Sequence, residues 1–155
     1  MTRLPRILPL AVGLLLSQGR AALGQHPSLS VAAHIGYNFN DLNEVLLGGQ
    51  AIAQLTPFAG LNAGASAYPA VSGSLWMGYL TVRVSPLARM RALYFGAGVY
   101  TSRAANGTAR ASDTGFIGTL GVRSAGRLHL FGEVQLLKVG ALGAQGLTGL
   151  GVRIW

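Results

Sequence analysis

Cysteine is absent from this sequence of 155 residues. The absence excludes disulfide bonds and thiolate metal sites, and it also removes the lipidated cysteine that anchors a lipoprotein. Three histidines and four acidic residues are well separated along the chain, so no metal-ligand spacing is present. We therefore expect neither a metal nor any other cofactor.

Charge is also scarce. Only 10% of the residues are charged, whereas 23 residues are glycine; an average soluble domain has roughly 25% charged residues and about 7% glycine. The net charge is +8, but the basic residues are scattered singly, apart from Arg89 and Arg91, without a stripe or an aromatic stacking platform, so no nucleic-acid partner is expected. So few charges would protect a water-facing surface poorly, and they favour a surface that faces lipid.

Long apolar runs are missing as well, because no stretch reaches the roughly 18 uninterrupted apolar residues of a transmembrane helix. The first 24 residues have another pattern: a basic start at 2–6, an apolar core of about ten residues at 7–16 and the small residues Ala22 and Gly24 on either side of Leu23. This pattern predicts a signal peptide over 1–24, cleaved before Gln25, and therefore an exported domain over 25–155.

Beyond residue 25, apolar residues alternate with polar or small ones, with the period of two that marks β-strands. Eight such runs have about ten residues each, which matches the roughly 9–11 residues of a barrel strand that crosses a membrane better than the 5–6 that are commonest in globular sheets. The runs lie at 29–39, 45–55, 58–68, 74–84, 90–101, 114–123, 128–136 and 145–155. The pattern predicts an all-β fold, an eight-stranded antiparallel up-and-down transmembrane barrel.

An even number of strands places both termini on one side, which is the periplasmic side in single-chain bacterial barrels. The predicted periplasmic connections are near 56–57, 85–89 and 124–126. The predicted external connections are near 40–44, 69–73, 102–113 and 139–144. The polar stretch 102–113 is expected to be the longest loop, and the periplasmic connections to be shorter on the whole.

Aromatic residues gather near the ends of the runs, as expected for the girdles at the two membrane interfaces. Those assigned to the external rim are Tyr37, Phe39, Tyr68, Trp76, Tyr100 and Phe116, and those assigned to the periplasmic rim are Phe58, Tyr94 and Trp155.

The polar face of the runs is expected to line the lumen, where a buried acid needs a partner. Glu133 is therefore predicted to be neutralised by an arginine such as Arg123 or Arg83. Interiors of eight-stranded barrels are just filled by side chains, so bulk diffusion is not expected, although many small residues leave room for a narrow or wet lumen. The predicted polar cluster of the lumen consists of His34, Gln50, Gln54, Tyr79, Arg83, Arg123, His129, Glu133 and Gln135.

Together with the strand pattern, the ending Gly149-Leu150-Gly151-Val152-Arg153-Ile154-Trp155 resembles the superfamily of small outer-membrane β-barrel proteins that contains the OmpA transmembrane domain and the OmpX and OmpW families. The resemblance covers residues 28–155. It implies a location in the bacterial outer membrane and insertion by the barrel-assembly machinery, which recognises a last strand ending on an aromatic residue. Trp155 takes the place of the usual phenylalanine, whereas Arg153 departs from the apolar residue often found there.

The functional expectation is a structural or surface-interaction role in contact with outer-membrane lipid and lipopolysaccharide. Candidate contacts for lipopolysaccharide phosphates or a partner are Arg103, Arg110 and Asp113 in the predicted long loop, with Lys138 near another. Two alternatives stay open: a narrow channel for small or apolar solutes, and a soluble lipocalin-like binder in the periplasm or outside the cell. The oligomeric state is open too.

An enzyme is not expected. The barrel deacylases carry histidine and serine two residues apart on a strand, but His129 is followed at that spacing by Phe131. No nucleophile therefore lies beside a base, and no catalytic residue is assigned.

Overall fold

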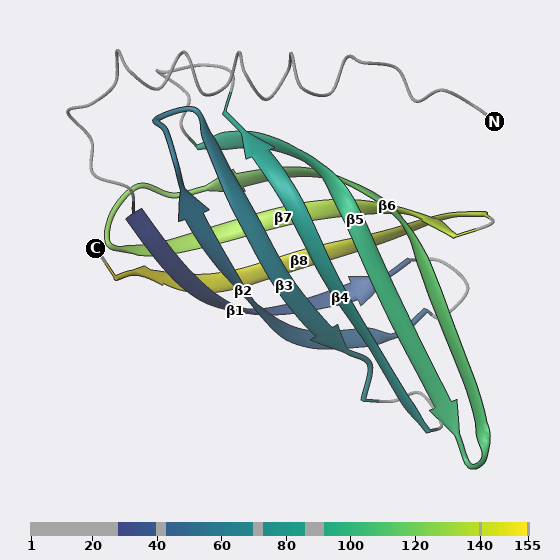
Figure 1. The fold of residues 1–155 in the computed structure, drawn as a ribbon. Coiled ribbons are helices and arrows are strands. Elements are labelled where there is room, and N and C mark those ends of the chain that lie inside the picture. The colour runs from purple at the N-terminus through teal and green to yellow at the C-terminus, as the bar shows by residue number, and fades with distance from the viewer. Residues whose placement is uncertain (1–27, 40–42, 70–72, 86–91, 140, 155) are drawn as a thin grey trace, which may run out of the picture.

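Eight strands close into one barrel in a computed structural model that describes residues 28–39, 43–69, 73–85, 92–139 and 141–154. Each strand pairs in an antiparallel manner with the next, and β1 pairs with β8 (Figure 1). The strands are β1 (Ser28–Asn38), β2 (Val45–Gln54), β3 (Ala59–Ala67), β4 (Ser74–Val84), β5 (Leu93–Asn106), β6 (Ala109–Arg123), β7 (Leu128–Val139) and β8 (Ala141–Arg153). The predicted all-β, eight-stranded, up-and-down architecture is confirmed.

The signal peptide predicted for 1–24 lies outside the described residues. Among the residues that are described, no helix is long and apolar enough to cross a membrane.

The barrel has two distinct ends. β1 begins and β8 finishes at one end, which we name the terminal end, and we name the opposite end the hairpin end. Turn residues adopt the backbone that their sequence favours: Asn43 has a φ of 50° and Gly126 a φ of 114°, as Asn and Gly tolerate. Gly126 thus provides the positive φ that the turn near 124–126 requires.

The long loop predicted at 102–113 is wrong. β5 and β6 continue through this segment and join at Gly107-Thr108, where Gly107 has a φ of 60°, and the resulting hairpin projects at the lower right of Figure 1. Composition suggested a loop, but glycine in the first position of a two-residue turn matches the right-handed twist of paired strands. The loop predicted at 139–144 is also wrong, because β7 runs to Val139 and β8 starts at Ala141.

The terminal end consequently does not have the shorter connections. Its connections are 55–58, 85–92 and 124–127, whereas those of the hairpin end are 39–44, 68–73, 107–108 and 140. Two of the four connections at the hairpin end are tighter than any at the terminal end, because paired strands have replaced the predicted loops there.

The outer surface of the barrel is a belt of large apolar side chains to which every strand contributes. Soluble monomers rarely expose contiguous apolar patches larger than a few hundred Å², and this belt goes all the way around. The surface therefore suits hydrocarbon and not water. Its exposed members include Val31, Ile35, Leu47, Leu61, Leu80, Val82, Phe95, Val99, Leu120, Val122, Leu130, Val134, Leu136, Leu150 and Val152.

Part of the aromatic prediction is wrong. Tyr37, Phe39, Trp76, Phe116 and Phe58 are exposed, as girdle residues should be, but three predicted rim tyrosines are buried in the lumen. Alternation decides their direction, because tyrosines that are in phase with the polar face point inward wherever they lie along the strand. The three are Tyr68, Tyr94 and Tyr100; Trp155 lies outside the described residues.

An arginine in the belt should be costly at mid-depth and tolerated near the rim. Leu80 is 51% exposed in the middle of β4, where it pairs with Ala63 and Val99. Phe116 is 72% exposed and pairs with Lys138, next to the hairpin end of β7. Leu80→Arg should lower the free energy of unfolding from lipid vesicles by about 2–4 kcal/mol, and Phe116→Arg by about 0–1 kcal/mol. Urea unfolding followed by tryptophan fluorescence measures both, with Leu80→Phe as the control. Equal small costs at the two positions would mean that water, not lipid, covers the belt.

Candidate functional site

The nine predicted lumen residues all occupy positions in phase with the interior of the barrel. Seven of them are buried, and Gln54 and Arg123 are half-buried near the terminal end. Gln54 donates to the carbonyl oxygens of Thr56 (2.7 Å) and Ala59 (3.2 Å), so it binds its own turn and not the other lumen residues.

Glu133 is the centre of the lumen. Its carboxylate forms an ion pair with Arg83 from β4, and it accepts hydrogen bonds from the Tyr94 hydroxyl at 2.8 Å and from the Gln135 amide at 2.7 Å. The Arg83 guanidinium also donates to the Gln50 oxygen at 2.9 Å and lies 4.4 Å from the centroid of the Tyr94 ring. Of the two arginines proposed from the sequence, Arg83 is the partner. With three donors on one carboxylate, Glu133 is engaged as a structural acceptor.

From Glu133 a chain of hydrogen bonds runs to the hairpin end. Gln135 accepts from Gln145 at 2.6 Å, and Gln145 accepts from the Tyr68 hydroxyl at 2.7 Å. Gln145 was not predicted from the sequence, although alternation on β8 places it in phase with the interior. Tyr79 donates to Gln50 at 3.1 Å. We name the following residues the lumen network: Arg83, Glu133, Gln135, Gln145, Tyr68, Gln50 and Tyr79.

Aromatic rings in the lumen lie over glycines of neighbouring strands. A β-carbon at Gly64 would lie 2.4 Å from the Tyr79 ring, and one at Gly121 would lie 2.4 Å from the Tyr94 ring. Small and large residues therefore alternate around the interior, as in other filled barrels. The abundance of glycine suggested a wet lumen, but here each of these glycines makes room for a ring.

Reactive groups are not brought together. His34 contacts the Ser66 hydroxyl at 2.9 Å through Nε2, but the only lumen carboxylate, Glu133, binds the residues named above, so no described acid orients this histidine. Among the described residues, no group of three histidine or acidic side chains could hold a metal ion.

A second candidate site is a cleft of about 460 Å³ on the outer face of β4, β5 and β6, near the hairpin end. Its two rows follow from the strand register: Ser74, Ala105 and Arg110 are neighbours across the sheet, and Trp76, Arg103 and Ser112 form the next row. We name these residues, with Ala104 and Ala111, the hairpin cleft.

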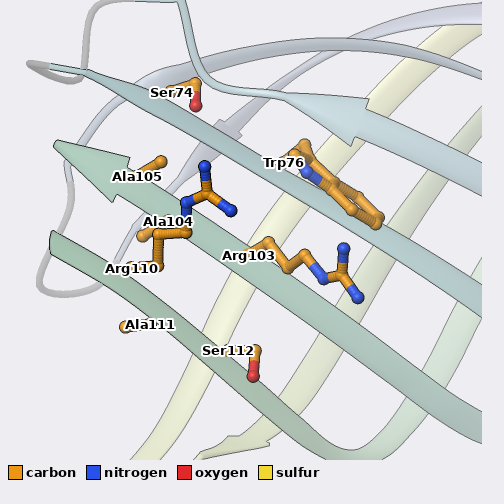
Figure 2. Close-up of a pocket in the computed structure, with 8 residues that line it drawn as sticks. All are labelled: Ser74, Trp76, Arg103, Ala104, Ala105, Arg110, Ala111 and Ser112. Carbon is orange, nitrogen blue, oxygen red and sulfur yellow. The ribbon is translucent and has the colours of Figure 1, made fainter. Parts of the chain in front are cut away.

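The hollow is present because the side chain of Ala105 is small, and Arg103 and Arg110 border this hollow. Figure 2 shows the Arg110 side chain crossing from β6 over β5 towards Ser74, while Arg103 extends on the side of Trp76. The Arg103 guanidinium lies 5.8 Å from the centroid of the Trp76 ring, within cation–π range. Neither arginine forms an ion pair within the described part of the chain, since the only one there joins Arg83 and Glu133. The cleft thus presents two unneutralised cations beside an aromatic ring.

Of the predicted surface residues, Arg103 and Arg110 line this cleft and Asp113 does not. Arg103, Arg110 and Asp113 lie on strands and not in a loop, which corrects the prediction, and Asp113 accepts a hydrogen bond from the Thr114 backbone at 2.8 Å. Lys138 is in β7, paired with Phe116. Arg153 ends β8 at the terminal end, and Trp155 is outside the described residues.

Removal of the lumen acid should be much more damaging than removal of the whole ion pair. Glu133→Gln leaves Arg83 as a buried unpaired charge, and we expect the free energy of unfolding to fall by about 3–5 kcal/mol. The double variant Arg83→Met/Glu133→Leu should recover most of this loss because no charge stays buried. Urea unfolding from vesicles gives both values. A loss below about 1 kcal/mol for Glu133→Gln would show that water solvates Arg83 in the lumen.

No protein-family model matches this sequence, and no curated protein matches it either. Solved structures match over most of the chain. The N-terminal β-barrel domain of Pseudomonas aeruginosa OprF is similar with a TM-score of 0.64 and 14% identity, over 83% of this chain and 100% of that one. The outer-membrane protein Ail of Yersinia pestis, in a phospholipid bilayer nanodisc, gives 0.54 and 9% over 83% and 100%.

A designed transmembrane β-barrel gives a TM-score of 0.53 with 19% identity, over 84% of this chain and 98% of the designed one. Identities this low establish the fold alone. The chain therefore shares the closed eight-stranded barrel fold of these membrane proteins, natural and designed.

Proposed function

We propose that this chain is a bacterial outer-membrane protein with a structural or surface-interaction role, and that its lumen is closed to bulk diffusion. The observation that carries the proposal is the contrast between the two faces of the same strands. Large apolar side chains cover the outside of all eight strands, and hydrogen-bonded polar and aromatic side chains fill the inside. Among the structures to which the fold is similar, Ail is named an outer-membrane protein and the designed chain a transmembrane β-barrel.

The proposed orientation follows from the ends of the barrel. Bacterial barrels with an even number of strands keep both termini in the periplasm, so the terminal end faces the periplasm and the hairpin end faces outwards. Insertion by the barrel-assembly machinery is part of the proposal; it rests on β8, which closes the barrel against β1.

Of the alternatives, a soluble lipocalin-like barrel would need polar side chains where the apolar belt lies. A narrow channel would need a gap in the lumen network, yet the side chains of Gln135, Gln145 and Asn62 are completely inaccessible to solvent. An enzymatic role would need an acid that orients His34 beside the Ser66 hydroxyl, and no described acid does so. The surface role is therefore preferred to all three.

The contact proposed for the hairpin cleft is with phosphate groups of lipopolysaccharide. Aromatic side chains such as Trp76 favour the membrane interface, which places Arg103 and Arg110 at the depth of lipid headgroups. Guanidinium groups bind phosphate oxygens through paired hydrogen bonds, and no described acid competes for these two.

The outer-membrane proposal predicts heat-dependent mobility on SDS gels. The protein should be found in the outer-membrane fraction and should migrate differently before and after boiling, because a closed barrel resists SDS until it is heated. Recovery in the soluble fraction without a shift would reject the proposal.

Sealed proteoliposomes of the same preparation should show no solute-induced swelling. A matched control is Tyr79→Ala/Phe131→Ala, which removes two lumen rings and no charge and should permit swelling. Swelling by the unaltered protein, at the rate of this variant, would favour the channel instead.

Loss of either cleft arginine should weaken binding to lipopolysaccharide. We expect Arg103→Gln and Arg110→Gln each to reduce affinity for vesicles that contain phosphorylated lipid A by about threefold to tenfold, through lost charge-assisted hydrogen bonds. Vesicle flotation with phosphorylated and dephosphorylated lipid A measures the difference. Arg127→Gln removes one charge at the opposite end and should have no effect; an equal loss with this variant would refute a specific role of the cleft.

A further inference from the structure

The lumen has unbalanced charge at its terminal end. Arg83, Arg123 and Arg153 are in phase with the interior towards this end; Arg83 is buried, Arg123 is half-buried and Arg153 is exposed at the mouth. Glu133 is the only described acid near them. Glu133 is already paired with Arg83. The other described acids, Glu44 and Asp113, are at the hairpin end. Two arginines therefore have no counter-charge within the described residues.

Arg123 shows the consequence most clearly. It is half-buried at the end of β6, and its side chain has no ion pair or hydrogen bond within the described ranges. The positive charges of Arg153 and Arg83 act on it, while Tyr94 is the only group of opposite effect. A partly desolvated guanidinium among like charges is unfavourable unless an anion completes the group.

His129 is an independent sign of a missing ligand at the same place. It faces inward from β7, is only 2% exposed, and has two ring nitrogens without a hydrogen-bond partner of ordinary geometry. Its ring interacts with the backbone of Arg127 and with the charges of Arg123 and Arg153. Buried polar atoms of this kind are normally satisfied.

Strand register brings these groups to one region. His129 pairs with Gly151, the inward position of β8 next to Arg153, and a β-carbon at Gly151 would lie 2.4 Å from the His129 Nε2 atom. Arg123 pairs with Phe131, the inward position of β7 next to His129. Three consecutive strands, β6, β7 and β8, thus each contribute one donor side chain to the terminal mouth of the lumen.

We infer that this mouth binds a phosphate group, held by Arg123, Arg153 and His129. Two guanidinium groups and an imidazole offer more donors than the two oxygens of a carboxylate accept comfortably, whereas the three or four oxygens of a phosphate match them. Free phosphate or a phosphate ester could supply this group from solution, and a phospholipid headgroup could supply it from the adjoining leaflet. The inference uses neither the hairpin cleft nor a role in lipopolysaccharide binding.

Titration of the full chain, extracted into a zwitterionic detergent, with inorganic phosphate at constant ionic strength tests the inference. Calorimetry should give saturable binding that chloride does not reproduce. Arg123→Gln, Arg153→Gln and His129→Phe should each weaken it, the two arginine variants by about tenfold or more. Arg127→Gln removes one charge from the exposed 124–127 turn at the same end, outside the three proposed ligands, and should weaken binding much less than Arg123→Gln does. The heat-dependent gel shift verifies that each variant is folded, so a variant that fails to fold is replaced by one of the other two.

The source of the phosphate is decided with nanodiscs. If the barrel binds inorganic phosphate in detergent, soluble anions reach the site. If only nanodiscs with phosphatidylglycerol, and not those with phosphatidylcholine, stabilise the unaltered protein and fail to stabilise Arg123→Gln, the ligand is an anionic headgroup. No binding in either arm, or binding that Arg127→Gln weakens as much as Arg123→Gln does, overturns the inference. The outer-membrane proposal would survive that result, because fractionation and the gel shift test it separately.

Discussion

The pairing of β1 with β8 is the contact on which the rest of the structure depends. Hydrocarbon offers no partner to an exposed strand edge, so a sheet can cross a membrane only when its first and last strands meet. Residues 30–38 of β1 and 145–153 of β8 make this seam. The seam is close: a β-carbon at Gly149 would lie 2.2 Å from the carbonyl oxygen of Ala33, and one at Gly36 would lie 2.4 Å from that of Gly146. Glycine at these inward positions lets two strongly coiled strands approach, which connects the unusual glycine content with closure of the barrel.

Closure also fixes what the interior must contain. A barrel of eight strands has room for side chains and for little more, and each inward position faces others across a narrow space. The sequence meets this limit by pairing rings with glycines and amides with amides, and the lumen network connects Arg83 to Tyr68 through Glu133, Gln135 and Gln145. The same limit makes charge difficult to place. One acid can neutralise one arginine, and any further cation inside needs a partner that the described chain does not supply.

Alternation in the sequence was sufficient to predict the strand number, the two faces and the inward direction of residues such as His129 and Glu133, because a period of two is a local property. Contacts that depend on register were not predictable. Whether Arg83 or Arg123 would reach Glu133 depends on how far each strand is shifted against the next, and no local signal encodes that shift. The tyrosines show a different error: Tyr94 and Tyr100 had the phase of inward residues, but their position near strand ends was given more weight. At 102–113, polar composition outweighed the Gly107 turn, and a rigid hairpin was mistaken for a loop.

The arginines at the two ends of this molecule differ in how their charge is solvated. Arg103 and Arg110 are on the outer face beside Trp76, where water and lipid headgroups can solvate them and where salt screens their charge. Arg123 and Arg153 are in phase with the lumen; Arg153 is exposed at its mouth, but Arg123 is half-buried, and there screening is weaker. An anion at the outer cleft therefore replaces water that already stabilises the guanidinium groups, whereas an anion at the inner mouth relieves repulsion between cations and satisfies a buried histidine. Each hydrogen bond to a ligand oxygen therefore stabilises the inner arginines more than the outer ones, although a ligand reaches the inner mouth less easily. This difference follows from the strand face on which each arginine is placed.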